Sequence, residues 1–493
     1  MQPFCKYLFL LTACGFLLLS CSVTRNYNPD KKYSPQELTE DLSTLRNILE
    51  TKHPSLYWYT PKDSMDYFFN VSGISIRDSM TENQFAWFTL APLIAKIHCG
   101  HTSLMRSRSW EKFVRNKMIP TFPLFMKVWK DTMMVVGSIN RDSLVPRGSF
   151  VTAINGIPVK RIENVLFQYM PTDGYEENLN YIKLSADFSY YFRNVFGLFP
   201  FYKINFTDST GISKETMIPW WYPKIDSSQG NKKEKRPRLS RTEKMHQYRS
   251  IKTDSTVAVI DLNAFTKGNL NSFFRKSFRE IKKKNIQNLI LDLRVNGGGE
   301  INKAVRLAKY ILDKPFVVAD SAYSISKNFN PYGKYIGKSF WNNLALLFIT
   351  KKRADGKFHF GYWEQHQFKP KKKFHFDGQV YILTNGLTFS AGSLFCDFAK
   401  GQKNVTLVGE NTGGGWYGNS GILIPDITLP KTGLRARLPF FRLIAPHHPA
   451  EKGTGVMPDW YIGPNWRDVL SGRDTKMEDV LQYIRQGKNN GTD

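Results

Sequence analysis

The alternation of apolar strands and helices over residues 249–470 constrains the fold of this chain more than any other feature. Residues 257–262 (VAVIDL) and 289–295 (LILDLRV) predict strands, and the second is the continuous apolar run typical of a strand buried in a parallel sheet. Residues 271–284 and 301–312 have the apolar spacing of helices. Such alternation predicts a layered α/β domain with parallel strands.

A small-residue segment, TFSAGS (388–393), joins a third apolar strand, VYILTN (380–385), to a helix-like stretch, LFCDFAK (394–400). This order places Ser390 at the N-terminal end of a helix, where outward N–H groups and the helix dipole favour an anion. A serine nucleophile needs an oxyanion donor beside it. Ser390 is therefore the candidate nucleophile, and Ser393, one helical turn later, is a weaker one.

Two glycine-rich loops follow predicted strands, NGGG at 296–299 and the GGG of TLVGENTGGG at 413–415. Glycine lets the backbone approach a ligand closely and lets N–H groups point into a cleft. Neither loop has the spacing of a phosphate-binding or dinucleotide-binding motif. No Cys/His cluster has metal-ligand spacing, so we expect neither a metal nor an organic cofactor.

The chain is long and strongly basic, with 493 residues and a formal net charge of +27. That length predicts two or three domains. Basic residues gather at 231–244, 351–357 and 369–374, with no nucleic-acid-binding motif beside them. We expect no nucleic acid as partner, and the charge is explained either by solvated loops or by attraction to an anionic membrane surface.

The N-terminus has the pattern of a targeting segment. Lys6 precedes the apolar run 7–19, which at about 13 residues is short of the roughly 20 needed to span a membrane. The sequence Leu-Leu-Ser-Cys at 18–21 resembles the bacterial lipobox, in which the cysteine is acylated. We therefore predict a lipoprotein signal peptide at 1–20 and lipid attachment at Cys21. The serine that follows Cys21 favours the outer membrane, with the protein facing the periplasm.

Five further regions follow. Residues 21–116 are predicted to be helical, with capping boxes at Ser34–Glu37 and Thr81–Gln84. Residues 117–225 are predicted to be β-rich, and their segment 144–166, with a hairpin at Asn155-Gly156, resembles the core of a PDZ domain. PDZ domains bind extended peptides by strand addition; an unrelated small β-domain is the alternative. A basic linker (226–248), a core (249–475) and a C-terminal tail (476–493) complete the chain.

The segments LILDLRVNGGG, VYILTNGLTFSAGS and VGENTGGG together resemble, in order and spacing, the tail-specific or C-terminal-processing serine proteases. With the PDZ-like segment and GVMPDWYI (455–462), the resemblance covers most of residues 80–470. It implies a crotonase-like (ββα) α/β protease core and a serine endopeptidase that hydrolyses unfolded or extended polypeptides through an acyl-enzyme at Ser390. The amides of Gly299, or Gly298, and Ala391 fall at the oxyanion hole, and Asp459 falls at a structural position.

The chain departs from that family at the general base. Members with a serine–lysine dyad carry a lysine in the loop after VGE, whereas this chain has no lysine between Lys403 and Lys431. His101, in CGHTSL (99–104), resembles the histidine base of the tricorn-core branch, in which a distant glutamate orients the site. Glu451 is the best match for that glutamate.

Several alternatives stay open. His98, His447 and His448 compete with His101 for the role of base, and Trp416 and Tyr417 either line the substrate cleft or only pack. The missing lysine leaves open a catalytically inactive, peptide-binding envelope lipoprotein on the same fold, and the basic surface leaves open an envelope adaptor that binds anionic lipid. The oligomeric state is not predicted.

Two cysteines, Cys99 and Cys396, lie beyond the predicted lipid-attachment site. Each is close in sequence to a candidate catalytic residue. If His101 and Ser390 meet, the two cysteines are expected to be near enough for a disulfide. The alternative is that each is a buried small hydrophobic residue.

Overall fold

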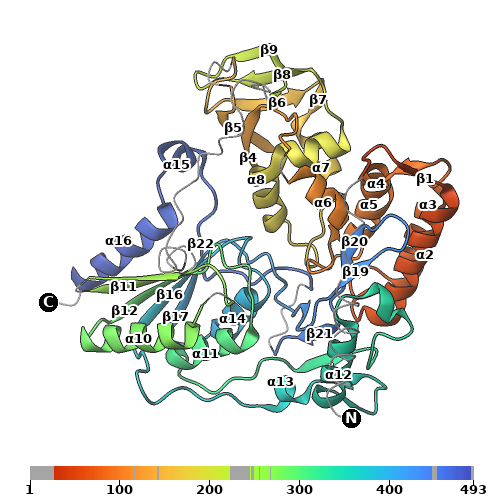
Figure 1. Cartoon of the computed structure of the whole chain (residues 1–493). Coiled ribbons are helices and arrows are strands. Elements are labelled where there is room, and N and C mark those ends of the chain that lie inside the picture. Colours follow the sequence, from red (N-terminus) through yellow and green to blue (C-terminus); the bar gives the residue numbers. More distant parts are fainter. Residues whose placement is uncertain are drawn as a thin grey trace, which may run out of the picture.

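The computed structural model describes residues 27–115, 117–140, 144–222, 245, 249–254, 256–266, 268–446 and 452–489. The predictions for the signal peptide, for Cys21 and for almost all of the linker 226–248 lie outside the described residues, as do His447, His448 and Glu451. Figure 1 shows a central sheet flanked by helices, a separate antiparallel sheet and a helical region formed by residues 27–115.

The central sheet has six strands, and all but one of its neighbouring pairs are parallel. Its strands, in spatial order, are β10 (Arg249–Thr253), β11 (Val257–Leu262), β12 (Asn288–Asp292), β16 (Gln379–Thr384), β17 (Val405–Gly409) and β22 (Trp460–Tyr461). Only the edge strand β10 runs antiparallel to its neighbour. The prediction of a parallel α/β core is confirmed.

Helices cover both faces of this sheet (Figure 1). Residues of α10 (Leu270–Lys283), α11 (Ile301–Ile311) and α14 (Ala391–Ala399) share one buried cluster with the sheet. On the other face α16 (Thr475–Asn489) buries Val480 and Ile484 against β16 and β17. Residues 476–489 of the predicted C-terminal tail therefore belong to a helix that packs on the core.

The antiparallel sheet lies at the top of Figure 1. Its strands are β4 (Leu124–Trp129), β5 (Thr132–Ser138), β6 (Phe150–Ile154), β7 (Ile157–Pro158), β8 (Phe201–Thr207) and β9 (Ser213–Pro219), with helices α7 (Val159–Phe167) and α8 (Asn178–Val195). Asn155 and Gly156 join β6 to β7 with φ of 51° and 76°, the positive values that a two-residue hairpin turn requires. The predicted hairpin is confirmed, and the likeness to a PDZ domain stays a prediction.

The helical region begins with β1 (Lys32–Tyr33) and α2 (Pro35–Lys52). It continues through α3 (Lys62–Ile74), β2 (Met80–Thr81), α4 (Glu82–Gln84), the π-helical turn η1 (Phe85–Leu90), α5 (Ala91–Ala95), β3 (Leu104–Met105) and α6 (Arg108–Val114). Both predicted capping boxes are present, Ser34 with Glu37 and Thr81 with Gln84. This region shares a buried cluster with residues after 420, and Asp41 accepts hydrogen bonds from the N–H groups of Lys431 (2.8 Å) and Thr432 (2.9 Å).

The stretch 325–375, which the sequence marks as an insertion, lies beside this helical region. It contains η2 (Tyr332–Tyr335), α12 (Ser339–Ile349), β14 (Lys351–Lys352), β15 (Phe358–His359) and α13 (Gly361–Gln365). A five-stranded sheet joins β14 and β15 to β13 (Ser321–Ser324), β21 (Phe441–Ile444) and β18 (Ser420–Gly421). A second small sheet pairs β19 (Asp426–Thr428) and β20 (Arg435–Arg437) with β3, and α15 (Trp466–Ser471) precedes α16. Among the described helices, none combines the length and apolar composition of a membrane span.

Candidate active site

Ser390 stands at the turn between β16 and α14, in a backbone conformation that few residues adopt. It is the N-cap residue of α14, as the sequence predicts, with φ 56° and ψ −122°. A positive φ is unfavourable for a residue with a side chain, and such strain persists where the surroundings impose it. Here Phe389 N–H donates to the carbonyl of Asn296 (2.9 Å), and Thr388 Oγ1 donates to that of Leu293 (2.9 Å).

The NGGG loop after β12 lies directly against this turn. A Cβ placed on Gly298 would lie 2.6 Å from Ser390 Cβ and 2.9 Å from Ala391 N, so only glycine fits. The Gly298 N–H already donates to Asn296 Oδ1 (2.9 Å), and its carbonyl accepts from Phe265 N–H (2.8 Å). Among the described residues, no acceptor lies within hydrogen-bond distance of the N–H groups of Gly299 and Ala391, so both groups are available as donors.

The second glycine loop, Gly413–Gly415, packs on the other side of the turn. A Cβ on Gly414 would lie 2.4 Å from Ser393 Oγ and 3.0 Å from Ser390 N, and one on Gly413 would lie 1.9 Å from the Gly386 carbonyl oxygen. Backbone packed this closely leaves no room for a long side chain. Ser393 is buried and its hydroxyl donates to the Thr388 carbonyl (3.0 Å), so the rival nucleophile is already committed to a structural hydrogen bond.

His101 lies next to the same turn, although it is almost 290 positions earlier in the chain. Its ring packs on that of Phe389, with 4.7 Å between ring centroids. Gly100 permits this approach, because a Cβ there would lie 2.6 Å from the Phe389 ring. Both ring nitrogens of His101 are buried, and neither has a hydrogen-bond partner among the described residues, Ser390 included. The structure brings His101 beside Phe389 but does not join it to the Ser390 hydroxyl.

The surroundings of His101 are buried and positively charged. Burial lowers the pKa of His101 to about 3, and the charges of Arg437 and Arg442 disfavour the imidazolium further. Lys183, on α8, acts on His101 in the same sense, and burial lowers the pKa of Lys183 itself to about 8. His101 is therefore neutral at pH 7, the state in which an imidazole can accept a proton.

The loop that carries His101 is held by two buried groups. His53 Nε2 lies 2.7 Å from Thr102 Oγ1, and Asp173 accepts a hydrogen bond from the Gly100 N–H. Asp173 Oδ2 also accepts from Gly415 N–H (3.0 Å), while its buried Oδ1 has no partner in the part of the chain that the structure describes. Asp173 thus ties the His101 loop to the second glycine loop. Sequence reasoning missed both Asp173 and Lys183, because neither stands in a recognisable motif.

The other candidates are engaged elsewhere. His98 Nδ1 lies 3.1 Å from Thr172 Oγ1 and from the Gly174 carbonyl, and so faces that loop. Asp459 accepts from Leu407 N–H (2.9 Å) and pairs with Lys400 (2.6 Å), which confirms its structural role. Trp416 Nε1 donates to Asp397 Oδ1 (3.0 Å) and its ring packs on the central core.

The hypothesis of a disulfide between Cys99 and Cys396 is wrong. Both are free, buried thiols. Cys99 packs in the hydrophobic cluster of the helical region, whereas Cys396, on α14, packs in that of the central sheet. Although His101 lies next to the turn at Ser390, the two cysteine side chains do not meet, because Cys396 lies further along α14 and points into the core of the central sheet.

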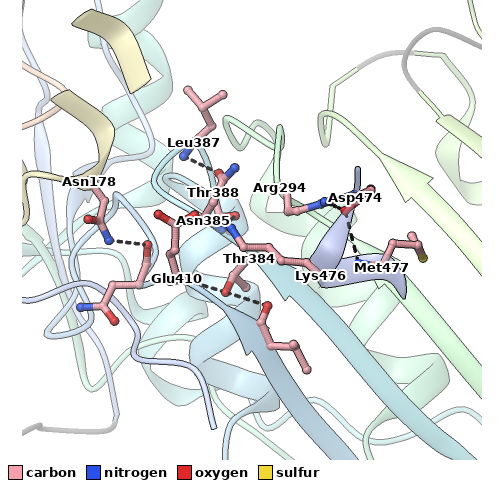
Figure 2. Close-up of polar contacts among 12 residues, drawn as sticks. Asn178, Arg294, Thr384, Asn385, Leu387, Thr388, Glu410, Asp474, Lys476 and Met477 are labelled. Carbon is pink, nitrogen blue, oxygen red and sulfur yellow. Dashed lines mark hydrogen bonds and ion pairs between the residues drawn. The ribbon is translucent and has the colours of Figure 1, made fainter. Parts of the chain in front are cut away.

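A cleft of about 710 Å³ opens at the carboxyl ends of β12, β16 and β17, beneath β4 and α8. Figure 2 shows Asn178, Asn385 and Glu410 on one side of this region and Lys476 and Arg294 on the other, with Glu410 paired to Lys476 and Arg294 to Asp474. Ser390 and His101 do not line the cleft. Asn385, five residues before Ser390, belongs to both the cleft wall and the loop that leads to the turn.

The comparisons with known proteins agree with this architecture. The model of peptidase family S41 matches residues 256–462. Mature CPAF superposes with a TM-score of 0.63 at 14% identity, covering 93% of this chain and 99% of CPAF. Mature CPAF complexed with lactacystin gives 0.63 at 15%, covering 92% and 99%. No curated protein matches. At these identities the structures show a shared mixed α/β fold, as the sequence predicts.

Proposed function

Because residues 256–462 form a peptidase family S41 domain, the domain of a serine-type peptidase, we propose that this chain is a serine endopeptidase with Ser390 as its nucleophile. Its substrates are unfolded or extended polypeptides. One observation carries the proposal: the strained backbone at Ser390, at the N-terminus of α14, lies against the Gly298 backbone. That arrangement supports a site in which the Ser390 hydroxyl is served by the N–H groups of Gly299 and Ala391, because acyl transfer needs a nucleophile with oxyanion donors beside it.

In this mechanism Ser390 Oγ attacks the carbonyl carbon of the scissile peptide bond while His101 takes the hydroxyl proton. The N–H groups of Gly299 and Ala391 stabilise the oxyanion that forms. The C–N bond then breaks, the amine leaves with the proton from His101, and an acyl-enzyme remains on Ser390. Water attacks this ester with His101 again as base, and the carboxyl product leaves.

The positive charge around His101 has two opposite effects in this scheme. Arg437, Arg442 and Lys183 disfavour the imidazolium, whereas the two guanidinium charges favour the oxyanion. A carboxylate near His101 would offset the first effect. Glu451 is the proposed partner, and Asp173, which binds the neighbouring Gly100 N–H, is the described carboxylate best placed to hold the His101 loop.

Finer features of the proposal concern substrate and location. We propose that the β4–β9 sheet acts as a PDZ-like module and presents an extended peptide to the cleft that contains Asn385. Lipid attachment at Cys21 would tether the enzyme to the bacterial envelope, in the outer membrane facing the periplasm. Lactacystin, which is bound to CPAF in a solved structure, is the first inhibitor to try.

The test is cleavage of an unfolded protein substrate by residues 22–493, which include every residue the structure describes. Wild type should cut, Ser390→Ala and His101→Ala should lose activity, and Ser393→Ala should keep it. Lys183, whose pKa burial lowers to about 8, is the alternative base near His101. If His101 is the base, Lys183→Met should retain activity. A wild type that is inert on several unfolded substrates, or loss of activity in Lys183→Met with retention in His101→Ala, would contradict the proposal.

A further inference from the structure

Helix α12 (Ser339–Ile349) exposes a continuous apolar stripe to solvent. Phe340, Trp341, Leu344, Leu347 and Phe348 recur at helical spacing, so they lie on one side of the helix. All five are exposed, with 66% of Trp341 and 82% of Phe348 accessible. Scattered exposed apolar residues are normal, but a contiguous stripe of large ones indicates a surface that contacts something.

The opposite side of α12 is firmly packed on the protein. Leu346 is fully buried in the hydrophobic cluster of the N-terminal helical region, and Ile349 packs against that cluster. Asn343 Oδ1 accepts a hydrogen bond from Phe329 N–H (2.9 Å). Lys52, at the end of α2, donates to Ser326 Oγ (2.9 Å) and to the Asn330 carbonyl (2.7 Å), which fixes the preceding loop. The stripe is thus held outward by the fold.

Positive charge borders the stripe at both ends. Residues 325–357 contain seven lysines and arginines and a single acidic residue, Asp355. Lys334 and Lys338 are exposed just before the helix, and Lys351 and Lys352 just after it. These lysines belong to the excess charge that the peptidase mechanism leaves unexplained.

We propose that α12 lays its exposed apolar face into an anionic lipid surface. An interfacial helix presents Trp, Phe and Leu to the acyl boundary and basic residues to the headgroups, and this short helix has both. At 11 residues it is too short to span a bilayer. A protein partner would need an apolar groove for the stripe and acidic residues at both of its ends. An anionic membrane has an apolar acyl region and negatively charged headgroups, and so matches both features.

The predicted lipid attachment is consistent with this contact. The predicted lipid attachment at Cys21 is six residues before Tyr27, and six residues span at most about 20 Å. A lipid anchor would therefore hold the helical region, to which α12 is packed, close to a membrane. In Figure 1, α12 lies at the lower right, apart from α14, the helix whose N-cap is Ser390, so this surface leaves the peptidase site open.

The test is flotation of unlipidated residues 22–493 with vesicles of equimolar phosphatidylglycerol and phosphatidylcholine, compared with phosphatidylcholine alone. Wild type should bind the anionic vesicles, and added salt should weaken the binding. Leu347→Ser with Phe348→Ser should weaken it by about tenfold or more. Lys351→Gln with Lys352→Gln should weaken it by about fivefold per lysine, on anionic vesicles only.

The matched control is Phe201→Ser with Met217→Ser. Both residues are exposed on β8 and β9, which lie at the top of Figure 1, far from α12. This control should bind as wild type does, and all variants should keep peptidase activity. Binding that is equal in wild type and Leu347→Ser/Phe348→Ser would overturn the proposal. So would a wild-type dimer that the same change makes monomeric, without vesicle binding, because a second copy would then cover α12.

Discussion

The substitution Gly298→Ala tests the packing on which the proposed site depends. A Cβ at this position would meet Ser390 Cβ at 2.6 Å, the Phe389 carbonyl oxygen at 2.8 Å and Ala391 N at 2.9 Å. Ordinary contacts are about 3.5 Å or more, so the loop and the turn must separate by about 0.6–0.9 Å. The φ of 95° at Gly298 adds strain for any L-residue.

The expected cost has two parts. Overpacking and the positive φ together should lower the free energy of unfolding by about 2–4 kcal/mol. A displacement approaching 1 Å between the oxyanion donors and Ser390 should lower kcat/KM by roughly 100-fold. Urea unfolding followed by tryptophan fluorescence measures the first, and hydrolysis of a fluorogenic peptide measures the second.

Gly297→Ala is the matched control, one residue earlier in the same loop. A Cβ there meets no atom within 4 Å, and Gly297 is exposed. Its stability should change by less than about 0.5 kcal/mol and its kcat/KM should stay that of wild type. If Gly298→Ala behaves like Gly297→Ala, the NGGG loop does not lie against Ser390 and the account of the oxyanion donors fails.

Three further predictions concern protonation and the thiols. Burial lowers the pKa of His101 to about 3, and the neutral form is the base, so kcat/KM should hardly change between pH 7 and pH 5; a midpoint near 6.5 would refute this. His53 and His101 both have a pKa of about 3 when folded, below the unfolded value near 6.5. The free energy of unfolding should therefore be highest above pH 6.5 and should decrease as the pH falls, by up to about 1.4 kcal/mol per pH unit for each histidine. Urea unfolding at several pH values measures this dependence, and His53→Gln should halve its slope. Residues 22–493 contain only Cys99 and Cys396, so the denatured protein should show two reactive thiols without reductant. The finding of no reactive thiol would indicate a disulfide.

The local elements were predictable because their signals are local. The capping boxes at Ser34 and Thr81 satisfy backbone N–H groups within one helical turn. The apolar run of β12 favours a strand buried on both faces in any fold that contains it. The turn at Ser390 followed from the order of strand, small residues and helix. Each of these features depends on a few neighbouring residues, which the sequence displays directly.

Contacts between segments distant in the sequence were harder to predict. His101 was identified only through its motif, and its packing on Phe389 depends on Gly100 and on the pairing of β3 with β20. Lys183 and Asp173 gave no signal, because burial by the tertiary structure is what perturbs their pKa values. Helix α12 is apolar on nearly all sides, so its sequence alone cannot tell the buried face from the exposed one.

The measurement that tests the central claim most directly is the intact mass of the protein after reaction with a fluorophosphonate, with the adduct mapped by peptide sequencing. The account predicts one adduct, on Ser390, that is absent in Ser390→Ala, strongly slowed in His101→Ala and unchanged in Lys183→Met. An adduct on Ser393 or another residue, or labelling that survives His101→Ala and disappears in Lys183→Met, would contradict it.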